Sequence, residues 1–260
     1  MKRFIAIFLL TAACTLAAAQ IKSTSGYTAK DARINYTEAS SLTLVGKLFP
    51  DTPNPYHRVD TVKYKGWTAT QNFQVRCSSG IIVAFRTNST VLSILTEYGQ
   101  LYYGVTTNVL AHRGYDLYIR ATENKGKFTP SSDGKWVYAA SAAPGHEKED
   151  QPVTIIKDMV TGMKECLLYL PLYSEERSIK IGVEEGAVLE PLENPFRYRV
   201  GIYGSSYTHG VSCGRAGMTY PAQFSRRTGI QLLRELPSVS LLSLACTCIH
   251  STTQKDVKYR

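Results

Sequence analysis

The sequence predicts a mainly β protein, in which a jelly-roll-like antiparallel β-sandwich is followed by an incomplete α/β segment. Up to about residue 184, short β-like runs are separated by Gly, Pro, Asn and Asp, which is typical of an antiparallel sandwich. Residues 186–195 interrupt this pattern with two prolines amid acidic residues. Beyond them the chain reads as strand, loop and helix, so we place a domain boundary in this interval.

Eight β-like runs make a two-sheet core credible for the first part of the chain. Asp133-Gly134 is a turn signal, and we expect it to return the strand that begins near Gly114. The expected strands are residues 42–48, 73–77, 81–87, 91–98, 115–120, 136–140, 166–172 and 179–183.

The second part of the chain has the element order of a βαβ unit. Residues 199–203 are expected to form a strand that enters a turn. Residues 220–227 then form a helix that Gly229 ends, and residues 230–233 begin a second strand. A single unit of this kind cannot cover both faces of a parallel sheet. It should therefore expose apolar surface unless it docks on the sandwich.

Residues 1–19 have the three regions of a secretory signal peptide. Lys2 and Arg3 supply the positive charge, an apolar run follows, and small residues end at Ala19. We expect cleavage after Ala19 and export of the protein to the periplasm or the extracellular space.

A lipoprotein anchor is the alternative to a cleaved signal peptide. Residues 11–14 are a loose match to a lipoprotein cleavage site, with Thr11 where Leu is usual, and cleavage there would leave Cys14 lipidated. No later segment approaches the roughly 20 apolar residues of a membrane span. We therefore expect no transmembrane helix.

Charge and cysteine content exclude some classes of partner. The formal net charge of +9 comes from scattered Lys and Arg, with no basic run, so we expect no nucleic-acid partner. The cysteines after the signal are odd in number and irregularly spaced. At most two disulfides can form, and free buried thiols fit equally well. Cys246 and Cys248 lack the second pair of a zinc site, and we expect no metal or other cofactor.

Ser206 is the candidate catalytic residue. It stands at the apex of the run Gly204-Ser205-Ser206-Tyr207-Thr208-His209-Gly210. A sharp turn between a strand and a helix presents a hydroxyl clear of the sheet and aims backbone N–H groups at a developing oxyanion. The two glycines supply the conformational freedom of such a turn. The alternative is a Gly/Ser-rich loop without chemistry.

Two blocks of the sequence resemble the SGNH, or GDSL-like, hydrolases. Residues 199–229 read RVGIYGSSYTHGVSCGRAGMTYPAQFSRRTG and resemble the first block of a branch with GSSxTHG, GMxYPAQ and an Arg-rich helix. Residues 113–118, RGYDLY, match the GxDLY motif of the β-domain that precedes such esterases. The resemblance implies that the α/β segment begins a flavodoxin-like hydrolase domain.

The family resemblance also implies roles for individual residues. The serine of the first block is the nucleophile, and its backbone N–H contributes to the oxyanion hole; both roles fall on Ser206. Ser205 stands where the broader superfamily has Asp. The family further needs a second-block glycine, a GxND asparagine and a C-terminal DxxH, and none of these patterns follows Ser206. His209 is too close to be the DxxH histidine, and His250 lacks the required Asp. We expect His209 and Gly210 to wall the substrate mouth, with a solvent-facing His209 as the alternative.

The GYDLY run reads as a structural motif through Gly114, Asp116 and Tyr118. In a strand, Asp116, Tyr118 and Arg120 share one face. Asp116 and Arg120 would lie about 13 Å apart along it, too far to pair. We expect Asp116 to hold a neighbouring loop or strand rather than to catalyse a reaction.

Residues 234–260 depart from the family pattern, in which a parallel strand leads into the second block. Their Ser/Thr/Leu/Cys bias fits a frameshifted or prematurely ended coding sequence, or else a genuine short strand with a polar tail. The expected organisation is a signal peptide over residues 1–19, a GxDLY-type sandwich over 20–190, the N-terminal part of an SGNH domain over 196–233, and an atypical tail over 234–260.

The resemblance implies an exported ester hydrolase that acts on an acylated carbohydrate or another small ester through an acyl-enzyme on Ser206. Without a base the serine stays protonated at neutral pH, so we expect weak activity or none from this chain. The alternative is a non-catalytic sandwich that binds a glycan or a protein partner. The 17 Tyr residues could stack on sugar rings, but Tyr also suits half-buried strand positions. The pattern leaves the oligomeric state open.

Overall fold

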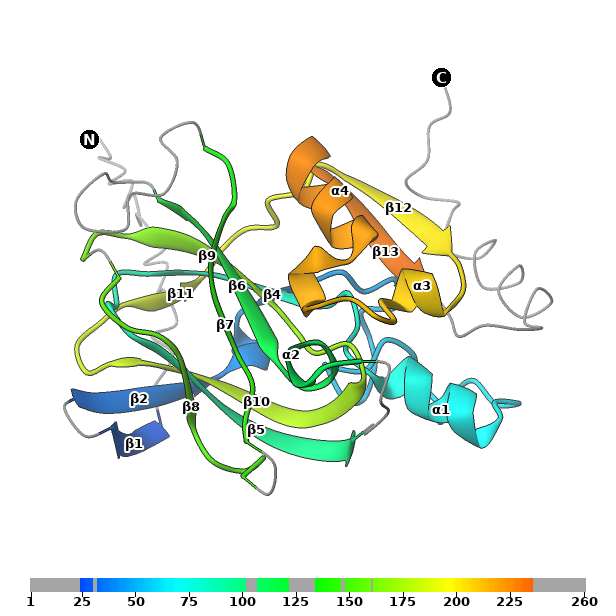
Figure 1. Cartoon of the computed structure of the whole chain (residues 1–260), viewed down its shortest axis with the longest axis horizontal. Coiled ribbons are helices and arrows are strands. Elements are labelled where there is room, and N and C mark those ends of the chain that lie inside the picture. Colours follow the sequence, from blue (N-terminus) through cyan, green and yellow to red (C-terminus); the bar gives the residue numbers. More distant parts are fainter. Residues whose placement is uncertain are drawn as a thin grey trace, which may run out of the picture.

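The computed structural model describes residues 24–29, 32–101, 107–121, 134–145, 148–159 and 161–235. The expected signal peptide with Cys14, and residues 236–260 with Cys246, Cys248 and His250, lie outside the described residues. Two antiparallel sheets dominate the structure, and a small α/β segment packs beside them (Figure 1). The predicted fold class is therefore confirmed.

The first sheet has five strands that all pair antiparallel. Its central strand, β10, pairs Ile181 with Ile94 of β5 on one side and with Thr37 of β2 on the other. In spatial order the strands are β1 (Thr24–Ala29), β2 (Ala32–Glu38), β10 (Ser174–Glu184), β5 (Leu92–Leu101) and β8 (Val153–Ile156).

The second sheet is also antiparallel, and it carries the GYDLY run on β6. Strand β7 returns beside β6 with Tyr115 opposite Ala142, as the Asp133-Gly134 turn signal predicted. In spatial order the strands are β11 (Leu189–Pro191), β4 (Ile82–Thr87), β9 (Lys164–Tyr169), β6 (Tyr115–Ala121) and β7 (Val137–Ala142), and β3 (Thr43–Val45) also pairs with β4. Because β11 pairs with β4, part of the expected boundary segment belongs to this sheet.

The main core lies between the two sheets. Phe85, Leu117 and Leu168 of the second sheet pack there with Ile94 and Ile181 of the first. All five are buried, as strand alternation requires of one sheet face. Burying a large apolar side chain stabilises a fold by about 1.5–3 kcal/mol relative to leaving it exposed, so this layer holds the sandwich together.

The second sheet is unusual because its central strands are buried on both faces. The outward-facing residues of β4, β9 and β6 form another buried cluster, with Tyr118, Leu167 and Tyr169 among them. Ala216 and Ala222 of the C-terminal segment pack onto this cluster. The α/β segment therefore covers the outer face of the second sheet, which explains why that face is apolar.

The C-terminal segment is a βαβ unit, as the sequence predicted. Strands β12 (Tyr198–Tyr203) and β13 (Ile230–Glu235) pair parallel, and α4 (Tyr220–Thr228) connects them. Helix α4 ends at Gly229 in a left-handed conformation with φ of 74°. The short helices α3 (Ser206–His209) and η2 (Ala216–Met218) lie between β12 and α4.

Some large apolar side chains of this unit are exposed in the described structure. Tyr198 is 67% exposed, Val200 45% and Phe224 42%, although the other side of the unit docks on the second sheet. The sequence left two outcomes open, exposed apolar surface or docking on the sandwich; the described structure shows docking together with some exposed apolar side chains.

Residues 73–77, which were expected to form a strand, lie instead in and just after helix α1 (Ala69–Arg76). Thr68 accepts a hydrogen bond from the Gln71 backbone, and the Gln71 side chain accepts one from the Thr68 backbone. This capping box fixes the start of the helix. The strand expected over residues 73–77 is therefore wrong, because the capping box starts a helix at Ala69 that runs through Phe73 and Val75.

Two further short helices precede β3 and β6, namely η1 (Ala39–Ser41) and α2 (Val109–His112). Among the described residues, no helix is both long enough and apolar enough to cross a membrane.

Candidate active site

Ser206 is the first residue of α3, directly after the turn that follows β12. Gly204 is required in that turn because an added Cβ would lie 1.9 Å from Thr208 Oγ1. Ser205 caps the helix, and its side chain accepts a hydrogen bond of 3.4 Å from the Tyr207 N–H. The turn therefore presents Ser206 at the N-terminal end of a helical turn, where backbone N–H groups lack intrahelical partners.

The other end of α3 is buried against the sandwich. Gly210 has φ of 116°, and an added Cβ would lie 2.7 Å from both Leu172 Cδ1 and Thr219 Cγ2. His209 is only 3% exposed. The alternative in which His209 faces solvent is therefore wrong, and Gly210 is buried as well. Close packing of the turn on the sandwich, which local sequence cannot show, is the reason.

Both ring nitrogens of His209 are engaged. Nε2 hydrogen-bonds the Leu172 carbonyl, and Nδ1 lies 3.3 Å from an Arg58 Nη2. A carbonyl only accepts and a guanidinium only donates, so Nε2 carries the proton and Nδ1 accepts. The ring also stacks on Tyr173 with centroids 4.3 Å apart.

The electrostatic setting of His209 keeps it neutral. Burial lowers its pKa well below the ordinary value, and the charges of Arg58 and Arg234 lower it further, against the opposing hydrogen bond to Leu172. A ring that is neutral, buried and bonded at both nitrogens has no free site for the Ser206 proton. His209 is therefore not a general base for Ser206.

The other described histidines are also committed elsewhere. His57 Nε2 lies 3.0 Å from Glu175 Oε1, and His112 is buried in α2. No hydrogen bond joins Ser206 Oγ to a histidine or carboxylate within the described residues. That part of the chain thus holds a candidate nucleophile without its base.

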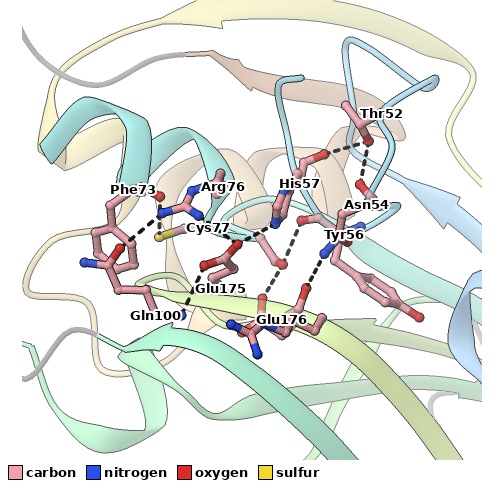
Figure 2. A network of polar contacts seen from close by, with 12 residues as sticks. Thr52, Asn54, Tyr56, His57, Phe73, Arg76, Cys77, Gln100, Glu175 and Glu176 are labelled. Carbon is pink, nitrogen blue, oxygen red and sulfur yellow. Dashed lines mark hydrogen bonds and ion pairs between the residues drawn. The ribbon is translucent and has the colours of Figure 1, made fainter. Parts of the chain in front are cut away.

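Two adjacent glutamates form a polar network, not predicted from the sequence, that links α1 and the 52–57 loop to the start of β10 (Figure 2). Glu175 contacts His57 and Arg76, each through Oε1, and accepts a hydrogen bond from the Gln100 N–H. Burial acts to raise the Glu175 pKa, but these partners outweigh it and lower the pKa to about 2. Glu175 is therefore ionised at neutral pH.

Glu176 is the opposite case, although it is the next residue. It is fully buried and accepts hydrogen bonds from the hydroxyls of Ser78 and Ser174. Burial raises its pKa to about 8, and the neighbouring negative charge of Glu175 adds to the rise. No local pattern reveals this pair, because all of their partners except Ser174 come from segments about 75 to 120 residues away in sequence.

The GYDLY run lies at the junction of the sandwich and the C-terminal segment. Gly114 has no room for a side chain, because an added Cβ would lie 2.6 Å from the Leu110 carbonyl oxygen. Asp116 accepts hydrogen bonds from the Gly217 N–H at 2.8 Å and from Arg215 Nη1 at 3.1 Å. Tyr118 lies under the Arg226 guanidinium, 3.7 Å from ring centroid to Cζ. The structure thus places all three motif residues in packing or polar contacts at this junction.

Burial raises the pKa of Asp116 to about 6, whereas Arg215 and the Gly217 N–H oppose that rise. Arg226 also donates a hydrogen bond of 2.7 Å to the Gly217 carbonyl. Gly217 is therefore held through both its N–H and its carbonyl group. Within the described residues, no three His, Cys, Asp or Glu side chains gather as metal ligands would.

Known proteins with similar sequence or structure fit this architecture. One similar protein is a Bacteroides ovatus protein described as a GDSL-like lipase, which is 37% identical to this chain. Its crystal structure superposes with a TM-score of 0.69 over 78% of this chain. The salicylyl-acyltransferase SsfX3 of a tetracycline biosynthetic pathway is 20% identical, with a TM-score of 0.52 over 80% of this chain, and supports the fold alone. No curated protein matches significantly.

The chain spans 57% of the length of the Bacteroides ovatus protein and 55% of the length of the acyltransferase. Residues 34–189, more than half of the chain, match the family model described as GxDLY, the N-terminus of SGNH-hydrolase-type esterases. That match covers most of both sheets but not β1, and the segment with Ser206 follows it. This chain belongs to the GxDLY family of SGNH-type esterases.

Proposed function

We propose that this chain carries the nucleophile of an exported SGNH-type esterase, and that Ser206 is that nucleophile. The observation that carries the proposal is the position of Ser206 at the first residue of α3, at the carboxyl end of β12 in a parallel strand pair. In open α/β sheets, ligands bind at the carboxyl ends of the strands. The GDSL-like lipase assigned to the Bacteroides ovatus relative supports an ester as the substrate.

The reaction proceeds through an acyl-enzyme. Ser206 Oγ attacks the ester carbonyl carbon and gives up its proton, and the ester's alcohol leaves with a proton. Water then attacks the acyl carbon and releases the carboxylic acid, which regenerates the serine. We propose that the Ser206 N–H donates to the oxyanion in both steps, which its position in the first turn of α3 supports.

We propose an acylated carbohydrate or another small ester as the substrate. The expected signal peptide supports an extracytoplasmic polymer as the source of such an ester, with an anchor through Cys14 as the alternative location. Because the described residues bring no base to Ser206, we expect the 260-residue chain to turn over slowly or not at all.

The test compares Ser206→Ala with Ser205→Ala, since the two serines are adjacent and only Ser206 is proposed as the nucleophile. Hydrolysis of p-nitrophenyl acetate should disappear in Ser206→Ala and persist in Ser205→Ala. A fluorophosphonate should label Ser206, as located by peptide mass spectrometry. Activity that survives Ser206→Ala and is lost in Ser205→Ala would overturn the assignment.

An inactive chain needs a second readout. If neither p-nitrophenyl acetate nor the fluorophosphonate reacts, the chain is passed over immobilised polysaccharides. Retention on such a column would favour the alternative, a non-catalytic glycan-binding sandwich.

A further inference from the structure

We infer that the sandwich positions Ser206 from the opposite end of α3, through a cluster of His209, Arg58 and Arg234 that we call the His209 clamp. The inference rests on the proposed role of Ser206 and adds residues outside the catalytic segment. None of the three side chains has a recorded contact with Ser206. They act on it through the single helical turn that separates Ser206 from His209.

Helix α3 transmits position because it is one rigid turn. The Ser206 carbonyl accepts hydrogen bonds of 2.9 Å from the N–H groups of both Gly210 and Val211. His209 N–H in turn bonds the Ser205 carbonyl at 3.2 Å. A displacement of His209 therefore shifts the backbone on both sides of Ser206.

Arg58 holds the His209 ring from the sandwich side. Its Nε donates to the Cys77 carbonyl at 3.0 Å, and its Nη2 donates to the Gln74 carbonyl and to His209 Nδ1. Gln74 lies in the last turn of α1 and Cys77 caps it, so the guanidinium sits at a helix C-terminus. Carbonyl dipoles at that end stabilise a buried cation, which explains how Arg58 can be 2% exposed.

Arg234 holds the His209 backbone from β13. Its Nη1 lies 3.4 Å from the His209 carbonyl oxygen and 3.1 Å from Ser79 Oγ, and its Nη2 donates to Thr219 Oγ1. The Ser79 hydroxyl itself donates to the His209 carbonyl at 2.6 Å. Burial lowers the Arg234 pKa to about 10, so the side chain remains a cation at neutral pH.

Gly80 makes room for the Arg234 side chain. Its φ is 90°, and an added Cβ would lie 3.1 Å from Arg234 Cδ. The ring of His209 and its carbonyl are thus held by different cations from different parts of the fold. Arg58 and Ser79 belong to the sandwich, whereas Arg234 belongs to the strand beside β12. The clamp therefore fixes α3 relative to both the sandwich and β13.

The test measures hydrogen exchange in the full-length chain, which does not depend on catalysis. In His209→Leu and Arg58→Met, the amides of peptides that span residues 204–213 should exchange about tenfold faster or more. The reason is that the clamp contacts no longer oppose local opening of this segment. Peptides from β4 and β9 should be unchanged. Arg33→Met is the control, because the Arg33 side chain is exposed and forms a surface pair with Glu185 at 3.9 Å.

Conservative variants separate positioning from bulk packing. His209→Gln keeps a neutral hydrogen-bond donor toward the Leu172 carbonyl, so residues 204–213 should exchange slowly, unlike in His209→Leu. A lysine at position 58 reaches fewer acceptors than the arginine, so exchange in Arg58→Lys should lie between that of Arg58→Met and the native sequence. The rate of Ser206 labelling by a fluorophosphonate should follow the same order.

Unchanged exchange at residues 204–213 in Arg58→Met would overturn the clamp. If His209→Leu unfolds the whole chain, the Arg58 variants decide alone. If hydrogen exchange is unchanged in the clamp variants but Ser206→Ala still abolishes hydrolysis, the clamp is wrong and the proposed function stands. If exchange speeds up as expected but Ser206→Ala retains hydrolysis, the clamp stands and the nucleophile assignment is wrong.

Discussion

Asp116 of β6 accepts a hydrogen bond of 2.8 Å from the backbone N–H of Gly217, a residue 101 positions later in the chain. The acid of the GYDLY run thus binds the loop between α3 and α4 rather than a neighbouring strand. Arg215 adds an ion pair at 3.1 Å. The motif therefore links the sandwich to the segment that carries Ser206, which gives a physical reason why the two occur together in this chain.

Asp116→Ala should destabilise the chain more than Asp116→Asn. Alanine leaves the Gly217 N–H buried without an acceptor, at a cost of about 1–3 kcal/mol in the free energy of unfolding. An asparagine side-chain oxygen can still accept from Gly217 and loses only the Arg215 ion pair. Urea unfolding measures both variants, with Glu190→Gln as the control, since Glu190 pairs at the surface with Arg86 at 3.5 Å. Equal losses for both variants would contradict the role assigned to the hydrogen bond.

Gly217→Ala should be destabilising, whereas Gly214→Ala should be nearly neutral. A Cβ on Gly217 would lie 2.4 Å from Tyr118 Cε2 and 2.6 Å from Asp116 Oδ2, but one on Gly214 meets nothing within 4 Å. Overpacking of this kind costs about 1–3 kcal/mol. Thermal unfolding compares the two variants. A Gly217→Ala midpoint equal to that of Gly214→Ala would show that the residues around Gly217 accommodate the added methyl group without a loss of stability.

The parts of the fold that sequence predicted well depend on local rules. Alternation along β6 places Leu117 in the core and Asp116 on the outer face. The left-handed Gly229 ends α4, and the strand that follows pairs parallel with β12. Each of these features is encoded within a few residues of where it acts.

The features that sequence missed depend on contacts between distant segments. His209 meets Arg58 across 151 positions and Leu172 across 37. Nothing near His209 in the sequence signals that it is buried, so its position in a Gly-rich turn suggested an exposed residue. The helix at 69–76 is a different case, because its capping signal, Thr68 followed three residues later by Gln71, is local in the sequence.

Cys77 and Cys166 should resist alkylation in the folded chain. The described cysteines, which include Cys213, are free thiols. Cys77 and Cys166 are fully buried, and burial raises the pKa of both, that of Cys166 to about 12. Thiolate is the reactive form, so inaccessibility and a high pKa act together.

Iodoacetamide at pH 8, followed by peptide mass spectrometry, should therefore modify Cys77 and Cys166 only after urea is added. Half-buried Cys213 provides the internal comparison, and it should react first of the three. Rapid modification of Cys77 in the native chain would mean that the α1 region opens readily.

Glu176→Gln should alter how stability depends on pH. The pKa of Glu176 rises from an ordinary 4.5 to about 8 in the folded chain, chiefly because of burial. Between these two values the folded state retains a proton that the unfolded state releases, so this group's contribution is full below pH 4.5 and declines as the pH rises toward 8. Glutamine is neutral throughout and lacks that decline.

The free energy of unfolding, measured by urea titration at pH 5, 6.5 and 8, should therefore fall more steeply with pH in the native sequence than in Glu176→Gln. Glu190→Gln serves as the control, since it removes a half-exposed carboxylate and should leave the slope unchanged. The adjacent Glu175 has a pKa of about 2 and is present in all three proteins, so its own ionisation does not distinguish their pH dependences between pH 5 and 8. Parallel curves for the native sequence and Glu176→Gln would show that Glu176 is ionised in the fold, with Ser78 and Ser174 stabilising a buried carboxylate instead of a carboxylic acid.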